Sequence, residues 1–114
     1  SETTIDYGSS ASLVNFIHYY ATLNNFKISK PLALTGGLVY TDNNIEIEPV
    51  SGIKQKVISA ANNNIQYLVV SKDNFAEALK TKQNFNLKNI TIIKADSLKV
   101  LIEQLSIHEI LEKD

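Results

Sequence analysis

The sequence contains no cysteine, no arginine and no methionine, and each absence narrows the range of possible functions. Without cysteine, the chain forms no disulfide and offers no thiolate ligand to a metal. Without arginine, it lacks the side chain that binds phosphate or guanine through two parallel hydrogen bonds. Because methionine is absent even at position 1, we expect a processed product or a piece of something longer.

Strong net charge and long apolar runs are absent as well. The formal charge is -1, and the lysines are scattered along the chain rather than massed, so we expect no nucleic-acid contact. No apolar run approaches the roughly 20 residues of a membrane span, and no signal-peptide pattern is present. We therefore expect no transmembrane segment in this chain and a cytoplasmic location.

Hydrophobic residues make up 44% of the 114 positions, enough for the core of one domain. The spacing of apolar residues predicts an α/β class (α+β by some criteria), with helices packed on a small mixed sheet and a β-hairpin. Helix starts are expected at Ser10, Ile53 (to Asn62), Asp73, and Asp96 or Ser97, the last helix running toward Ile110. Strands are expected at 32–34, 67–70 and 90–93, and a hairpin at 38–40 and 45–47 with its turn at 41–44. Alternation of strands and helices in the second half predicts right-handed crossovers.

The first helix start offers a candidate nucleophile. Ser10 stands between small residues, Gly8 and Ala11, which leave room for a substrate carbonyl. The first-turn N–H groups and the positive end of the helix dipole could stabilise an oxyanion there. The structural alternative is that Ser9 or Ser10 only caps the helix.

Neither histidine is well placed to activate this serine. His18 lies about 12 Å along the helix axis from Ser10, whereas a base must come within about 3 Å. His108 belongs to a terminal helix with charged neighbours. The two histidines have no ligand cluster around them, so we expect no metal site.

Glycines and acidic residues in the middle of the chain are better explained by structure than by binding. Gly36-Gly37 and Gly52 fit neither nucleotide-binding pattern, and turn geometry explains them. Asp42, Glu46 and Glu48 suggest a hard-cation site at first sight. Glu46 and Glu48 share one face of a strand, so we expect them to form its solvated side.

A lysine can replace histidine as the base if desolvation lowers its pKa from about 10.4. Lys54 and Lys56 flank the apolar stripe of the helix that starts at Ile53, one on each side. Periodicity therefore leaves both open, and the alternative for either is a solvated lysine beside the core.

Five segments, in this order, resemble the proteolytic domain of the Lon family of Ser/Lys peptidases. They are Gly8–Ser12, Leu34–Gly36, Pro49–Lys56, Ala60-Ala61 and Val69–Asn74. The serine at the end of the first segment is closest to the archaeal, membrane-linked branch. The resemblance covers essentially the whole chain, and the order of the segments is more specific than any one of them.

This resemblance implies roles for individual residues. Ser10 would be the nucleophile and Lys56 the general base, with Thr35 helping to hold the lysine amine. Backbone N–H groups around Ser9 and Ser10, next to Ala11, would serve the oxyanion. Neutral Lys56 would take the Ser10 proton, and the reaction would pass through an acyl-enzyme.

The resemblance also implies the setting of the reaction. Substrates would be proteins or peptides, and the domain would sit in a hexamer-like homo-oligomeric ring. The chain itself would need no cofactor, since ATP and Mg²⁺ act only through an ATPase domain that this sequence lacks. We expect the chain to be the C-terminal portion of the family's domain. Any association with a membrane would be made through parts outside this sequence.

Three departures from the family pattern motivate an alternative. Ser51 replaces a first glycine, Gly37 replaces the usual glutamate or serine, and the hairpin is longer than typical. All lie near the lysine segment. The alternative is a catalytically silent domain of the same fold that acts as an oligomerisation scaffold. A general small-ligand-binding α/β domain would need only the secondary-structure pattern.

Overall fold

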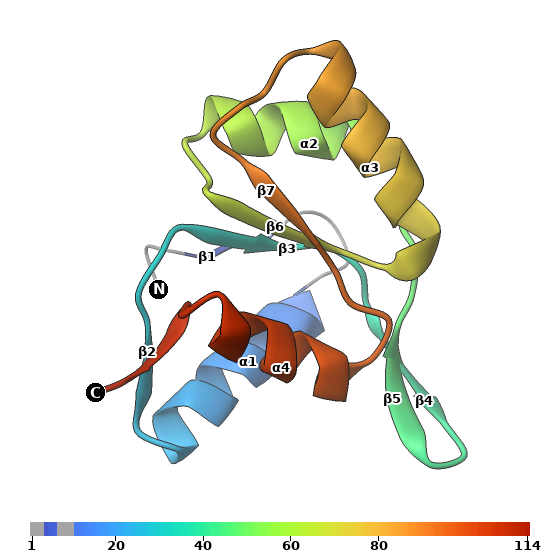
Figure 1. The fold of residues 1–114 in the computed structure, drawn as a ribbon. Helices are drawn as coiled ribbons and strands as arrows, with labels where there is room; N and C mark the ends of the chain where they lie inside the picture. The colour runs from blue at the N-terminus through green and yellow to red at the C-terminus, as the bar shows by residue number, and fades with distance from the viewer. Residues whose placement is uncertain (1–3, 7–10) are drawn as a thin grey trace.

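A computed structural model describes residues 4–6 and 11–114 (Figure 1). The strands are β1 (Thr4–Asp6), β2 (Phe26–Ile28), β3 (Leu32–Leu34), β4 (Leu38–Thr41), β5 (Asn44–Ile47), β6 (Tyr67–Val70), β7 (Thr91–Lys94) and β8 (Leu111–Lys113). The helices are α1 (Ala11–Leu23), α2 (Ile53–Asn62), α3 (Lys72–Asn84) and α4 (Leu98–Ile107).

The main sheet has four parallel strands in the order β1-β3-β6-β7. Antiparallel pairing is confined to two smaller ribbons, the β4–β5 hairpin and the β2–β8 pair. This combination of helices with parallel and antiparallel strands confirms the predicted α/β class. The parallel strands end on one edge of the main sheet, because Asp6 pairs with Leu34 and Leu34 pairs with Val69.

Helices cover both faces of the main sheet (Figure 1). Alternate strand residues point to opposite faces. Leu32 and Leu34 pack into the core that contains α1 and α4. Ala33 between them packs into the core that contains α2 and α3. All of β3, three of four residues of β6 and two of four residues of β7 are therefore buried, which accounts for the apolar runs of these strands.

The first crossover of the main sheet differs in hand from the later ones. The strand order advances in a single direction from β1 to β7. Helices α2 and α3 lie on one face, with the usual right hand that the alternating pattern predicts, whereas α1 lies on the opposite face (Figure 1). The connection from β1 through α1 and β2 to β3 is therefore left-handed.

Each described helix is followed, two residues after its last residue, by a residue with positive φ. These residues are Asn25, Asn64, Asn86 and Glu109, with φ of 58°, 60°, 53° and 57°. After α2, the N–H of Ile65 donates to the Ala60 carbonyl at 3.0 Å, closing the left-handed helix stop. Asparagine tolerates this conformation better than other residues with a side chain, so part of the chain's asparagine content serves helix termination.

Most predicted boundaries are confirmed, including 32–34, 53–62 and 67–70. The prediction that the third helix starts with Asp73 as its cap was wrong. The helix begins at Lys72 because Ser71, in extended conformation, is the N-cap, and Asp73 lies in the first turn. Ser97 caps α4 through a hydrogen bond from the Val100 N–H at 3.2 Å. The pairing of β2 with β8 was not predicted, and α4 ends three residues before Ile110.

No described helix is both long enough and apolar enough to cross a lipid bilayer.

Candidate functional site

The sequence-predicted residues that the structure describes lie toward the carboxyl edge of the main sheet. Thr35 directly follows β3. In the chain, the serine segment comes between Asp6, the last residue of β1, and Ala11, the exposed first residue of α1. Ser9 and Ser10 themselves lie outside the described residues. Because β1 pairs with β3 in parallel, the chain leaves β1 at the edge where Thr35 lies.

Thr35 is fully buried, and its hydrogen bonds connect β3 to β6. Its hydroxyl donates to the Val69 carbonyl at 2.7 Å, and its backbone N–H donates to the same oxygen at 3.1 Å. Since the hydroxyl has only one proton, the Thr35 oxygen can offer only lone pairs to any further partner.

The glycines after Thr35 allow two chain segments to cross closely. Gly36 has a φ of 97°, and a Cβ atom built on it would lie 2.5 Å from the Glu48 carbonyl oxygen. The Gly37 carbonyl accepts the Glu48 N–H at 3.0 Å. Turn geometry and close backbone approach thus explain Gly36, as the sequence predicted.

The two lysines that periodicity left equivalent differ in the structure. Lys54 is exposed, and its amine lies 5.4 Å from the centre of the Phe85 ring. Lys56 is half-buried, and its amine lies 3.4 Å from the Ser51 carbonyl oxygen, the long end of the hydrogen-bond range. Both belong to the start of α2, whose N-cap Gly52 has a φ of 70°.

Sequence reasoning missed the residue that attaches this lysine segment to α3. Asn74, in the first turn of α3, is 7% exposed. Its side chain exchanges two hydrogen bonds with the backbone of Val50, at 2.8 and 3.0 Å. The available signal was the sequence Ser71-Lys72-Asp73-Asn74, which places an asparagine three residues after a helix cap.

The histidines lie away from this edge or lack polar partners. His108 packs against Tyr67, at the amino end of β6, with 5.3 Å between ring centres. The Nε2 atom of His18 is buried and has no hydrogen-bond partner among the described residues. Burial lowers the pKa of His18 below its ordinary value, so this imidazole resists protonation.

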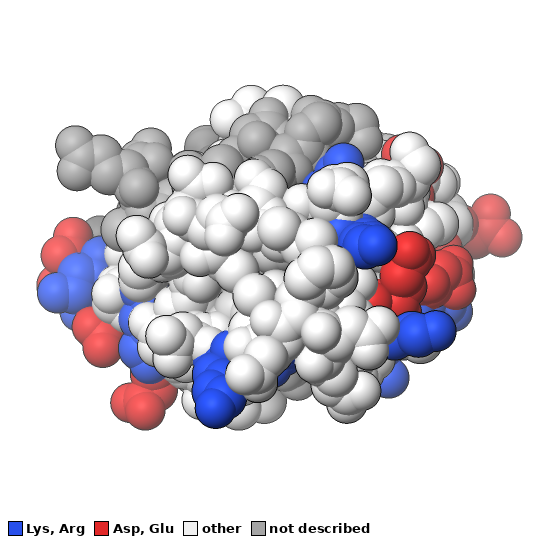
Figure 2. Space-filling model, turned by 90° about the horizontal axis from the view of Figure 1, so that it is seen from above, with Lys and Arg blue, Asp and Glu red and all other residues white. Residues whose placement is uncertain are grey.

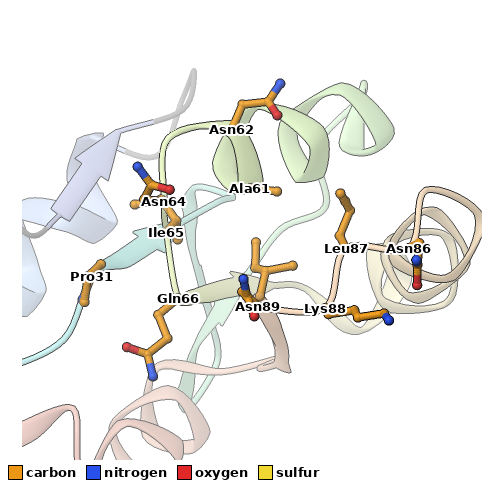
Figure 3. Close-up of a pocket in the computed structure, with 11 residues that line it drawn as sticks. Pro31, Ala61, Asn62, Asn64, Ile65, Gln66, Asn86, Leu87, Lys88 and Asn89 are labelled. Carbon is orange, nitrogen blue, oxygen red and sulfur yellow. The ribbon is translucent and has the colours of Figure 1, made fainter.

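Two cavities open at opposite ends of the main sheet. The larger, about 600 Å³, lies among loops before β3, β6 and β7, and five of its eleven lining residues carry carboxamides (Figure 3). Its carboxamides come from Asn62, Asn64, Gln66, Asn86 and Asn89. None of the sequence-predicted site residues lines it. Ligands of parallel α/β sheets usually bind at the carboxyl ends of strands, so we place the candidate site at the other end.

The smaller cavity, about 430 Å³, opens at the carboxyl edge beside Pro49. Its charged lining consists of four carboxylates and one lysine, from Glu46, Glu48, Asp73, Asp96 and Lys72. Glu46 and Glu48 are exposed, as expected for a solvated strand face. Among the described residues, no group of three or more side chains is arranged to hold a metal ion. Seen over α2 and α3, charged side chains lie mostly toward the rim of the molecule (Figure 2).

Comparison with known proteins gives one positive result. The family model of the Lon protease (S16) C-terminal proteolytic domain matches residues 3–108. A search of curated proteins and a search of solved structures each found no match. The matched range includes the serine segment, Thr35 and the lysine segment.

Proposed function

The chain belongs to the family of Lon protease (S16) C-terminal proteolytic domains, and from this membership we propose that it is a serine endopeptidase. Ser10 is the nucleophile and Lys56 the general base. The observation that carries the proposal is the family match across residues 3–108, a range that includes both positions. Substrates are proteins or peptides, as for a proteolytic domain in general.

The proposed reaction transfers an acyl group twice. The free amine of Lys56 takes the proton of the Ser10 hydroxyl while the serine oxygen bonds to the scissile carbonyl carbon. The carbon–nitrogen bond breaks, and the lysine proton passes to the leaving amine. Water then attacks the ester carbon and gives a proton to Lys56. The bond from that carbon to the serine oxygen breaks, Lys56 passes the proton to the serine oxygen, and the new carboxyl group is released.

Two features of the described residues support Lys56 rather than Lys54 as the base. Lys56 is half-buried, and its amine contacts the Ser51 carbonyl in the loop that leads into α2. Lys54 is exposed, and its amine lies over the Phe85 ring instead. Thr35 is the acceptor that we propose for the amine of the base, since its own hydroxyl proton is given to the Val69 carbonyl.

We further propose that the chain works within a homo-oligomeric, hexamer-like ring of a larger ATP-dependent protease in the cytoplasm. ATP and Mg²⁺ would act on another domain, not on this one. Family membership supports this setting, and the ring size is measured by sedimentation velocity of the whole protein.

The test is labelling with a serine-reactive phosphonate probe, together with cleavage of a fluorescent unfolded protein. We expect Ser10→Ala to abolish both, and Lys56→Ala to lower both by about 10³-fold or more. Lys54→Ala is the matched control, since it removes a lysine from the same helix turn, and it should retain both. Equal labelling of Ser10→Ala, Lys56→Ala and the parent would instead support a catalytically silent scaffold.

A further inference from the structure

A buried carboxamide pairs with the backbone just before the lysine segment. The Val50 N–H donates to Asn74 Oδ1 at 2.8 Å, and Asn74 Nδ2 donates to the Val50 carbonyl at 3.0 Å. The side chain thus satisfies both backbone groups of one residue, as a neighbouring β-strand would. Asn74 is 24 positions away in the chain, so this contact joins α3 to the loop that leads into α2.

A third hydrogen bond fixes the orientation of this carboxamide. The Ser71 hydroxyl donates to Asn74 Oδ1 at 3.2 Å. The backbone N–H of Asn74 also donates to the Ser71 carbonyl at 3.1 Å. Rotating the amide by 180° would set its NH₂ group against the Val50 N–H and lose both acceptor contacts. The arrangement therefore has one satisfied orientation, held at the end of β6.

The start of α2 has little other support of this kind. Its N-cap, Gly52, has no side chain and makes no side-chain cap bond. The Lys56 amine is bonded only to the Ser51 carbonyl among the described residues, and Ser51 immediately follows Val50. A displacement of Val50 would carry Ser51 with it, and with Ser51 the carbonyl that the lysine amine contacts.

The same strand end also holds Thr35. The Val69 carbonyl of β6 accepts both hydrogen bonds of Thr35. Ser71, two residues further on, bonds to the Asn74 side chain, which in turn bonds to the Val50 backbone. We propose that Asn74 is a positioning residue that sets the Lys56 segment in register with Thr35 by binding both backbone groups of Val50. This inference rests on the proposed function, because it assigns Asn74 a role in aligning the base.

The test is Asn74→Ala, assayed for cleavage of the fluorescent unfolded protein well below its melting temperature. We expect kcat to fall about 10- to 100-fold with KM little changed, because small misplacements of a catalytic group cost that much. Thr81→Val is the matched control. It removes a side-chain hydrogen bond of a buried residue in the same helix, from the Thr81 hydroxyl to the Glu77 carbonyl, without touching Val50, and its kcat should stay within about threefold of the parent's.

A second variant keeps the inference testable if Asn74→Ala does not fold. Asn74→Asp retains the acceptor for the Val50 N–H but turns an acceptor toward the Val50 carbonyl, so we expect a similar fall in kcat. A variant that melts at a lower temperature yet keeps the parent's kcat per folded molecule would show a purely structural role and overturn the inference.

Combining each change with Lys56→Ala separates this inference from the proposed function. If Asn74 acts through the lysine, Asn74→Ala should lower the residual activity of Lys56→Ala by no more than about twofold. A full additional 10-fold loss overturns the positioning role. If Lys56→Ala alone is as active as the parent, the proposed function fails first, whatever Asn74→Ala does.

Discussion

The Thr35 hydroxyl and the Val69 carbonyl form a 2.7 Å hydrogen bond that leaves the threonine oxygen able only to accept. A lysine amine is a donor, and as a free base it also keeps one lone pair for a serine proton. An acceptor fixed by a neighbouring strand can therefore orient such an amine without competing for that lone pair. This geometry gives the resemblance-based role of Thr35 a physical reason.

Replacing Thr35 tests this role. In Thr35→Val, the Val69 carbonyl keeps the backbone N–H of residue 35, so we expect the free energy of unfolding to fall by only about 1 kcal/mol. We expect kcat for the fluorescent substrate to fall about tenfold or more, since the amine loses its acceptor. Thr35→Ser keeps the hydroxyl and should retain most of the activity. Full activity in Thr35→Val would contradict the role.

Alanine at the two positive-φ glycines should separate backbone strain from steric overlap. Gly52→Ala meets no atom within 4 Å, so it suffers only the left-handed conformation, about 1–2 kcal/mol of unfolding free energy. Gly36→Ala adds an overlap with the Glu48 carbonyl, and we expect about 3 kcal/mol or more. Urea denaturation measures both values, and equal losses would be evidence against the close crossing.

Among the positive-φ residues that follow the described helices, Glu109 alone is not asparagine. Replacing it should stabilise the protein. Its φ of 57° is costly for glutamate. Glu109→Asn should raise the free energy of unfolding by about 0.5–1 kcal/mol. Glu109→Gln removes the same charge without easing the backbone, so it serves as the control and should change little. A matching gain in both variants would point to charge rather than conformation.

The lowered pKa of His18 predicts acid-sensitive stability. Because burial favours the neutral imidazole, the unfolded chain binds more protons than the folded chain as pH drops below the ordinary pKa of 6.5. Stability should therefore decline as pH falls from 7 through the folded-state pKa. His18→Leu should flatten this part of the profile. Melting temperatures of parent and variant between pH 7 and 5 measure the effect, and parallel profiles would refute it.

Several helix ends carry a local signal in the sequence. Asparagine followed by an apolar residue marks three stops, at Asn25-Phe26, Asn64-Ile65 and Asn86-Leu87. The left-handed asparagine ends the helix, and the apolar residue after it folds back onto the protein. Such signals are local, which is why the boundaries of α2 and of the strand after it were predicted correctly.

Contacts between segments that are distant in the chain could not be predicted from the sequence. Strands β2 and β8 are three residues each and lie far apart in the chain. No local pattern therefore predicts that Phe26 pairs with Lys113. The hydrogen bonds of Asn74 to Val50 are equally non-local. In the sequence, Asn74 is only a polar residue near a helix start. Its burial depends on the loop before α2 packing against α3.

The amino-acid sequence by itself determined the α/β class, most helix and strand boundaries, and the family resemblance that the match over residues 3–108 supports. It also left Lys54 and Lys56 equivalent on either side of one apolar stripe. Only the tertiary structure set them apart, leaving Lys54 exposed beside Phe85 and Lys56 half-buried. The physical reason is that a helix's own period fixes which residues share a face, whereas burial depends on the element that packs beside it.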